Sequence, residues 1–85
     1  NEIGIARFLT YLAKTYTELR ELTKAQDLAK KSVELYHKHY GENHIDTAWA
    51  LLHLGNVYKE QGNYAKAKPI LEKTLEIYKK HYKPN

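Results

Sequence analysis

The sequence repeats itself with a period of 42 residues, and this repeat restricts the possible folds more than any other feature. When residues 1–43 are aligned with residues 43–85, 16 of the 43 positions are identical. The run KHY at 38–40, for example, returns at 80–82. Repeats of this length are supersecondary units that bury their apolar faces by stacking on one another. We therefore divide the chain into two units, residues 1–42 and 43–85, that form a single compact body.

Each unit is expected to contain two helices, because its apolar residues return about every 3.6 positions. The helices are expected near residues 3–19, 23–40, 45–61 and 64–82. Two antiparallel helix hairpins stacked side by side form an all-α superhelix, or solenoid, of four helices. The residues expected to face the core from the first and third helices are Ile5, Ala6, Leu9, Leu12, Ala13, Tyr16, Ala48, Leu51, Leu54, Gly55 and Tyr58.

Two glycines of the second unit are expected to have different roles. Gly62 ends a helix, because glycine adopts the left-handed conformation of that position at little cost, and Asn63 caps the helix that follows. Gly55 lies inside a helix, where glycine costs about 1 kcal/mol relative to alanine. We expect it to face Ala67 on the partner helix, so that two small residues let the backbones approach closely.

The first unit and the linker carry different turn signals. Arg20 occupies the position equivalent to Gly62, so we expect a different or longer turn there, followed by a capping box that begins at Thr23. In the linker, Gly41 is expected to end the second helix and Asn43 to cap the third.

The second unit carries a spaced set of small, aliphatic and aromatic residues, namely Leu51, Leu54, Gly55, Tyr58, Gly62, Tyr64, Ala67, Leu71 and Tyr78. This pattern resembles the tetratricopeptide repeat. The 42-residue period and the segments HIDTA at 44–48 and KPIL at 68–71 are similar to the longer repeats of kinesin light chains. The resemblance implies antiparallel helix pairs in a right-handed superhelix. It also implies that the first helix of each pair lines a concave side, which usually binds peptides or protein segments.

The expected binding surface is the face of the first and third helices that lies opposite their apolar stripe. Its residues recur at helical spacing, so they would form two parallel stripes along a protein-binding groove. Trp49 is the most informative member, since a large aromatic residue off the apolar stripe often marks a contact. The alternative is that Trp49 packs against the linker or the neighbouring unit. The expected groove residues are Arg7, Thr10, Tyr11, Lys14, Trp49, Leu52, His53 and Asn56.

The resemblance does not extend to every groove position. The tandem asparagines of kinesin light chains, which contact bound peptide, are replaced here by Thr10-Tyr11 and Leu52-His53. Asn56 does match a groove asparagine that is common in peptide-binding repeats. Its counterpart in the first unit, Lys14, offers a positive charge to a carboxylate.

A second hypothesis is self-association. A solenoid covers its apolar faces with neighbouring units, and about three units are usually needed. The last helix carries more apolar residues than one partner helix can cover, so we expect a homo-oligomer, formed by end-to-end stacking or by helix exchange across the 41–44 linker. On this hypothesis the chain is a structural repeat fragment, or a designed repeat, whose main contact is with copies of itself. The expected self-association residues are Ile70, Leu71, Leu75, Ile77 and Tyr78.

Composition and charge argue against other classes of protein. The net charge is +4, but the lysines are interleaved with glutamates as on solvated helix faces, so nucleic acid is not an expected partner. The longest apolar runs are only a few residues, so a membrane is not an expected partner either. The absence of cysteine fits a reducing compartment, and we expect a cytoplasmic protein. The histidines are not expected to bind a metal, and Ser32, the only serine, takes a core position. We therefore expect no catalytic residue, no cofactor and no enzyme activity.

Overall fold

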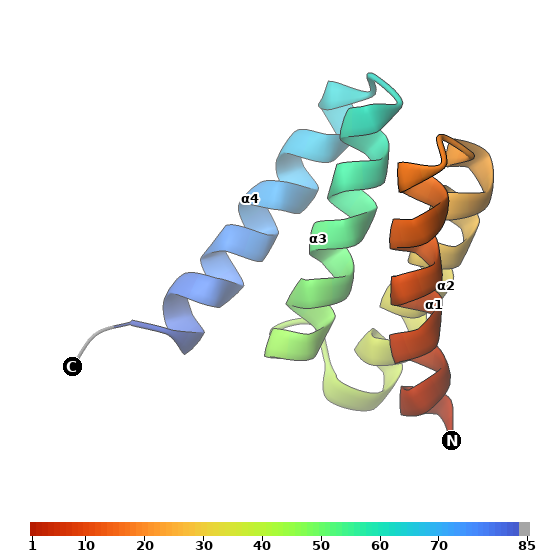
Figure 1. Ribbon diagram of the computed structural model, residues 1–85. Helices are drawn as coiled ribbons and strands as arrows, with labels where there is room; N and C mark the ends of the chain where they lie inside the picture. The colour runs from red at the N-terminus through yellow and green to blue at the C-terminus, as the bar shows by residue number, and fades with distance from the viewer. Residues whose placement is uncertain (84–85) are drawn as a thin grey trace.

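Four helices make up the fold, and a computed structural model describes them over residues 1–83. They are α1 (Glu2–Glu18), α2 (Leu22–Tyr40), α3 (Ile45–Glu60) and α4 (Tyr64–His81). Figure 1 shows α1 paired with α2 and α3 paired with α4, with α3 lying beside the first hairpin. The predicted all-α fold of two stacked hairpins is confirmed, and each described helix boundary lies within one residue of the predicted one.

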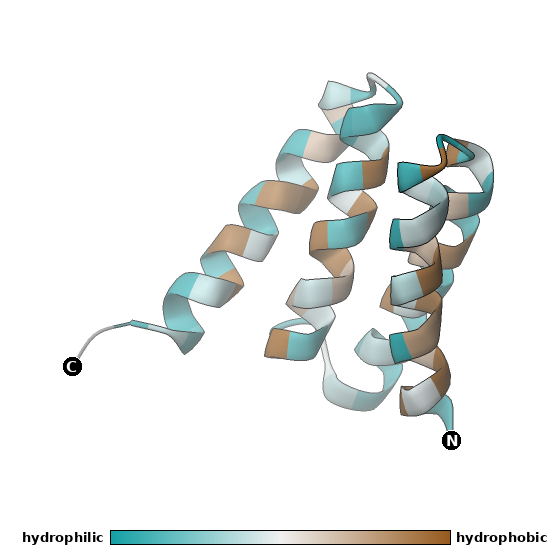
Figure 2. Ribbon diagram, in the orientation of Figure 1, coloured by the Kyte–Doolittle hydropathy of each residue, from teal (hydrophilic) through white to brown (hydrophobic). Residues whose placement is uncertain are grey.

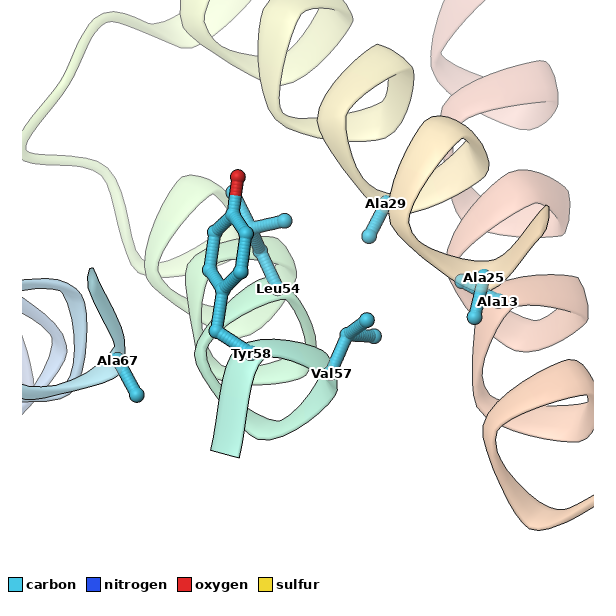
Figure 3. Close-up of a cluster of buried hydrophobic side chains, with 7 residues drawn as sticks. All are labelled: Ala13, Ala25, Ala29, Leu54, Val57, Tyr58 and Ala67. Atoms are coloured by element: carbon cyan, nitrogen blue, oxygen red, sulfur yellow. The ribbon is translucent and has the colours of Figure 1, made fainter. Parts of the chain in front are cut away.

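The hairpins are joined by a core in which small residues face larger ones. Figure 3 shows Ala13, Ala25 and Ala29 of the first hairpin turned toward Leu54 and Val57 of α3. All of these side chains are buried. The small side chains of α1 and α2 let α3 approach closely, and burial of its aliphatic side chains stabilises the joint.

Helix α4 has fewer neighbours than the other helices. Within residues 1–83 it packs on α3 alone, whereas α3 contacts all three other helices. Apolar positions nevertheless recur along the length of α4 (Figure 2). None of the four helices is long and apolar enough to cross a bilayer, as far as the described residues go.

The buried side of α1 differs from the predicted stripe. Ile5 is exposed, while Ala6, Thr10 and Ala13 are fully buried. The reason is that α1 packs on both α2 and α3, so its buried side is centred between the two neighbours and takes small residues. The Thr10 hydroxyl donates to the Ala6 carbonyl oxygen at 2.9 Å and also meets the hydroxyl of Ser32. The prediction that Ser32 takes a core position is confirmed.

The prediction that the two hairpins turn differently is wrong. Gly62 has φ 79° and Arg20 has φ 66°, so both residues adopt the left-handed conformation. The N–H of Glu21 donates to the Tyr16 carbonyl oxygen at 2.9 Å, just as the N–H of Asn63 donates to Tyr58 at 2.8 Å. The left-handed conformation costs a residue with a side chain about 1–2 kcal/mol.

Contacts across the joint hold Arg20 in this conformation. Its guanidinium pairs with the carboxylate of Glu60, and Nη2 donates to the Glu60 carbonyl oxygen at 3.3 Å. The predicted capping box is also wrong, because Thr23 lies inside α2 and the N-cap is Glu21, which makes no side-chain cap hydrogen bond.

The linker begins as predicted but caps α3 one residue later. Gly41, with φ 85°, follows the last residue of α2. The N-cap of α3 is His44 rather than Asn43, and His44 Nδ1 accepts a hydrogen bond from the Asp46 N–H at 3.0 Å. Asn43 Oδ1 instead accepts from Lys73 Nζ at 3.2 Å.

The close approach at Gly55 is confirmed, although its neighbour differs from the predicted one. Gly55 is buried, and a Cβ atom added there would lie 2.6 Å from Leu71 Cδ2 and 2.8 Å from Leu71 Cγ. The facing residue is therefore Leu71, one helical turn after Ala67. Asn63 caps α4 as predicted, since its side chain accepts from the Lys66 N–H at 3.3 Å.

Candidate functional site

Helices α1 and α3 are neighbours in the fold (Figure 1). Together they carry a mixed set of aromatic and charged side chains. Tyr11 of α1 meets Trp49 of α3 edge to face, with ring centroids 5.2 Å apart. His53, one turn after Trp49, packs edge to face on the same indole at 5.4 Å. These three rings form a continuous row across the two helices, which we call the aromatic row.

Trp49 also supports the joint between the hairpins. It is half-buried, packs against the cluster of Ala6, Tyr36 and Ala50, and lies 6.3 Å from the Tyr36 ring centroid. The alternative that Trp49 packs against the neighbouring unit is therefore confirmed, and its role as a binding contact stays a prediction. One part of the indole packs on the neighbouring hairpin, and the rest stays open to the surface shared with Tyr11.

A pocket lies on one side of the aromatic row, and we call it the tyrosine pocket. It has a volume of about 330 Å³ and draws residues from all four helices. Burial raises the pKa of the Tyr36 and Tyr78 hydroxyls, and for Tyr36 the nearby Arg7 guanidinium partly opposes this shift. Both phenols are therefore neutral at physiological pH and can donate a hydrogen bond. The lining residues are Arg7, Tyr11, Tyr36, Ile45, Asp46, Trp49, Tyr78 and Tyr82.

A second pocket lies beyond His53, and we call it the charged pocket. It has a volume of about 450 Å³ and lies between the last turns of α1 and α3. Burial, and next the Lys14 ammonium, lower the pKa of His53, so its imidazole is neutral at physiological pH. One ring nitrogen can then donate and the other accept. The lining residues are Lys14, Thr17, Glu18, Arg20, His53, Asn56, Lys59 and Glu60.

The sequence matches one known protein family over most of its length. The tetratricopeptide repeat family model matches residues 4–80, which is most of the chain. The chain is a tetratricopeptide repeat protein. The match confirms the predicted family, including its likeness to repeats of the kinesin light chain type. A comparison with curated proteins gave no match. Tetratricopeptide repeats are generally protein–protein interaction modules and are typically non-catalytic.

Six of the eight predicted groove residues line one of the two pockets of this tetratricopeptide repeat protein. The other two are Thr10, whose predicted placement is corrected, and Leu52, whose place on the groove stays a prediction. Thr10 is buried between α1 and α2, where its hydroxyl is hydrogen-bonded. Leu52, at the equivalent position of α3, is half-buried and lines neither pocket.

Sequence reasoning missed the acidic part of the charged pocket. Glu18 and Glu60 line it, and they are repeat-equivalent to each other. Each lies one turn after a predicted groove residue, Lys14 or Asn56, so extending the two stripes by one turn would have found them.

The predicted self-association residues of the tetratricopeptide repeat protein separate into two groups. Ile77 is only 2% exposed and lies inside the second hairpin, so its assignment to the outer surface is corrected. Leu75 is exposed, and Ile70, Leu71 and Tyr78 are half-buried. Ile77 and Leu75 are two positions apart, so they lie on nearly opposite faces of α4. Ile77 lies on the face that packs on α3, and Leu75 lies on the outer face.

The described part of the chain contains no cluster of three or more histidine, aspartate or glutamate side chains that could hold a metal ion.

Proposed function

We propose that the protein binds a peptide or protein segment along the surface formed by α1 and α3. The aromatic row of Tyr11, Trp49 and His53, with a pocket on either side, supports this most directly. Aromatic rings held by packing bury much area at little entropic cost, which suits them as anchors for a partner. The proposed role is binding without catalysis.

The two pockets favour a ligand with two chemical features. An aromatic or branched aliphatic side chain fits against the exposed edges of Tyr11 and Trp49. An acidic group fits the charged pocket, where the cations Lys14, Arg20 and Lys59 outnumber the two carboxylates. Arg20 is already paired with Glu60, so Lys14, Lys59 and the Asn56 amide are the groups proposed to meet the ligand.

An array of random peptides tests this proposal. Peptides selected by the wild-type protein should be enriched in one acidic and one apolar anchor residue. Their affinity should fall about fivefold or more in Asn56→Ala and in Lys14→Ala, and it should fall as salt concentration rises. Lys30→Ala on the outer face of α2 is the matched control and should bind as wild type does.

Trp49→Ala is not a clean variant for this test, because Trp49 also packs on the first hairpin. Tyr11→Ala removes an exposed ring from the aromatic row instead. Peptides that bind all three variants, Lys14→Ala, Asn56→Ala and Tyr11→Ala, as tightly as the wild type would refute the groove.

A second candidate function is self-association, and the apolar face of α4 favours it. Leu75 and Tyr82 are exposed there, and α4 has α3 as its only neighbouring helix within residues 1–83. Sedimentation velocity over a range of micromolar concentrations tests this candidate. A single monomeric species at every concentration would remove it.

A further inference from the structure

The outer faces of α1 and α4 are repeat-equivalent to the two faces that meet where the hairpins pack together. The joint is formed by one face of α2 and one face of α3. Shifting the α3 face back by 42 residues gives a face of α1, and shifting the α2 face forward gives a face of α4. We call these the α1 end face and the α4 end face. The α4 end face corresponds to the α2 side of the joint, and the α1 end face corresponds to its α3 side.

Four of the five residues of the α1 end face have α3 equivalents that are buried, and the fifth, Leu19, is equivalent to the exposed Gln61 that follows α3. Thr47, Ala50 and Val57 are each 1% exposed, and Leu54 is buried as well. In α1 the residue equivalent to Ala50 is Phe8, which is 64% exposed. The α1 end face comprises Ile5, Phe8, Leu12, Thr15 and Leu19.

The α4 end face has the same relation to α2. Ala29 and Tyr36 are buried, and Val33 is half-buried against the core cluster. In α4 the residue equivalent to Val33 is Leu75, which is 54% exposed. Beside it lies a shallow hollow of about 430 Å³. The α4 end face comprises Tyr64, Leu71, Leu75, Tyr78 and Tyr82.

The exposed apolar side chains of the protein gather on these two faces. Residues 1–83 expose eight large apolar side chains, of which six lie on an end face. Of the other two, Tyr11 belongs to the aromatic row and Tyr40 stacks on His44 with ring centroids 4.1 Å apart. The six are Ile5, Phe8 and Leu19 on the α1 end face, and Tyr64, Leu75 and Tyr82 on the α4 end face.

The turn end of the joint shows how these residues would meet. Within the chain, Gln61 Nε2 donates to Gln26 Oε1 at 3.0 Å and to the Leu22 carbonyl oxygen at 3.5 Å. The residue equivalent to Gln61 is Leu19, and the residue equivalent to Leu22 is Tyr64. Gln61 bonds the backbone carbonyl of Leu22, and the residue equivalent to Gln26 is Lys68, so the contact between two amide side chains has no counterpart on the outer faces. Leu19 and Tyr64 are exposed there instead, and their mutual burial is favourable.

From this equivalence we propose that the occupant of the α4 end face is the α1 end face of a second copy. The contact repeats the joint between α2 and α3, so each copy continues the solenoid of the one before it. Because two different surfaces meet, the association is heterologous. A stack of any length then still exposes one α1 end face and one α4 end face, to which further copies can bind. This proposal rests on the self-association candidate and identifies both of its surfaces.

Two blocked variants test the proposal by complementation. Phe8→Glu places a charge on the α1 end face, and Leu75→Glu places one on the α4 end face. Burying an unpaired carboxylate in an apolar contact should raise the dissociation constant by more than about tenfold. In sedimentation velocity the wild type should form species larger than a dimer as its concentration rises. Each variant alone should stay monomeric, and their equimolar mixture should form a one-to-one complex, because each variant keeps the face that the other lacks.

Matched variants control for fold and for the groove. Tyr11→Glu makes the same kind of change on α1 at a residue of comparable exposure, and it should associate as the wild type does. Ile5→Glu and Tyr64→Glu are second variants on the two end faces, used if circular dichroism shows that a first variant is unfolded.

Three results would overturn the head-to-tail contact. If Phe8→Glu alone still dimerises, the copies meet symmetrically through α4, and self-association survives without this geometry. If the mixture of Phe8→Glu and Leu75→Glu stays monomeric, the two faces do not pair. If the wild type is monomeric throughout, both self-association and this contact are wrong, while binding along the groove is still tested separately by the peptide array.

Discussion

Replacing Gly55 by alanine should destabilise the fold, although alanine is the better helix former. In an open helix the change would stabilise by about 1 kcal/mol. Here the added Cβ would lie 2.6 Å and 2.8 Å from two Leu71 side-chain atoms, both well inside van der Waals contact. Overpacking of a folded core costs about 1–3 kcal/mol. The difference between these terms gives an expected net destabilisation of about 1 kcal/mol.

The partner residue provides the decisive comparison. In a Leu71→Ala background the two clashing atoms are absent, and the nearest remaining atom is Ile70 Cγ2 at 3.3 Å from the added Cβ. Gly55→Ala should then stabilise by up to about 1 kcal/mol, the value for an open helix, because only a small shift of the Ile70 side chain is still needed. The coupling free energy between the two substitutions is therefore expected to be up to about 2 kcal/mol, within the range measured for residues in contact.

Urea and thermal unfolding, followed by far-UV circular dichroism, measure these changes. A change of about 1 kcal/mol moves the melting temperature of a domain of this size by roughly 4–8 °C. All variants are compared at one fixed protein concentration, because association would add to the apparent stability. Gly62→Ala is the matched control, since its φ of 79° strains alanine but no atom lies within 4 Å of the added Cβ. Its cost should not change in the Leu71→Ala background. A Gly55→Ala protein that melts above the wild type would refute the close-packing argument.

Three further predictions concern the turn, the linker and the charged pocket. Arg20→Gly should be more stable than Arg20→Ala by about 1 kcal/mol in urea unfolding, because both lose the pair with Glu60 and only glycine relieves the left-handed strain. His44→Ala should cost about 1 kcal/mol through loss of the α3 cap, and His44→Asp should restore that stability. The pKa of His53 is lowered in the folded state, so the unfolded chain takes up its proton first as the pH falls. The free energy of unfolding should therefore decrease below about pH 6.5, and His53→Gln should weaken that decrease in urea titrations across this range.

The periodicity of the sequence was sufficient to predict the helices and their boundaries. It did not predict which side of α1 is most buried, because a helical wheel orients a helix toward one neighbour and α1 has two. Thr10 was placed on the groove for this reason, whereas its hydroxyl is satisfied inside the first hairpin. Polar residues of this kind can be buried once a hydrogen-bond partner is present, and that partner is a property of the packed structure.

The turn at Arg20 was mispredicted because its cause lies far along the chain. Sequence rules place glycine at a left-handed helix end, and they take no account of a carboxylate on another hairpin. Glu60 meets Arg20 only after the two hairpins stack. The positions of the aromatic row were largely predictable, because Tyr11, Trp49 and His53 recur at helical spacing on two equivalent helices. The pairing of their rings depends on the joint and could not be predicted.

Since α4 rests on α3 alone, it has the least support of any helix in residues 1–83. Local opening free energies follow the number of buried contacts, so the amide protons of α4 should exchange with solvent faster than those of α2. A second copy seated on α4 would slow that exchange and leave α2 almost unaffected. The stability of this last helix against local opening would then increase with protein concentration, so the dynamics of α4 would depend on how much of the protein is present.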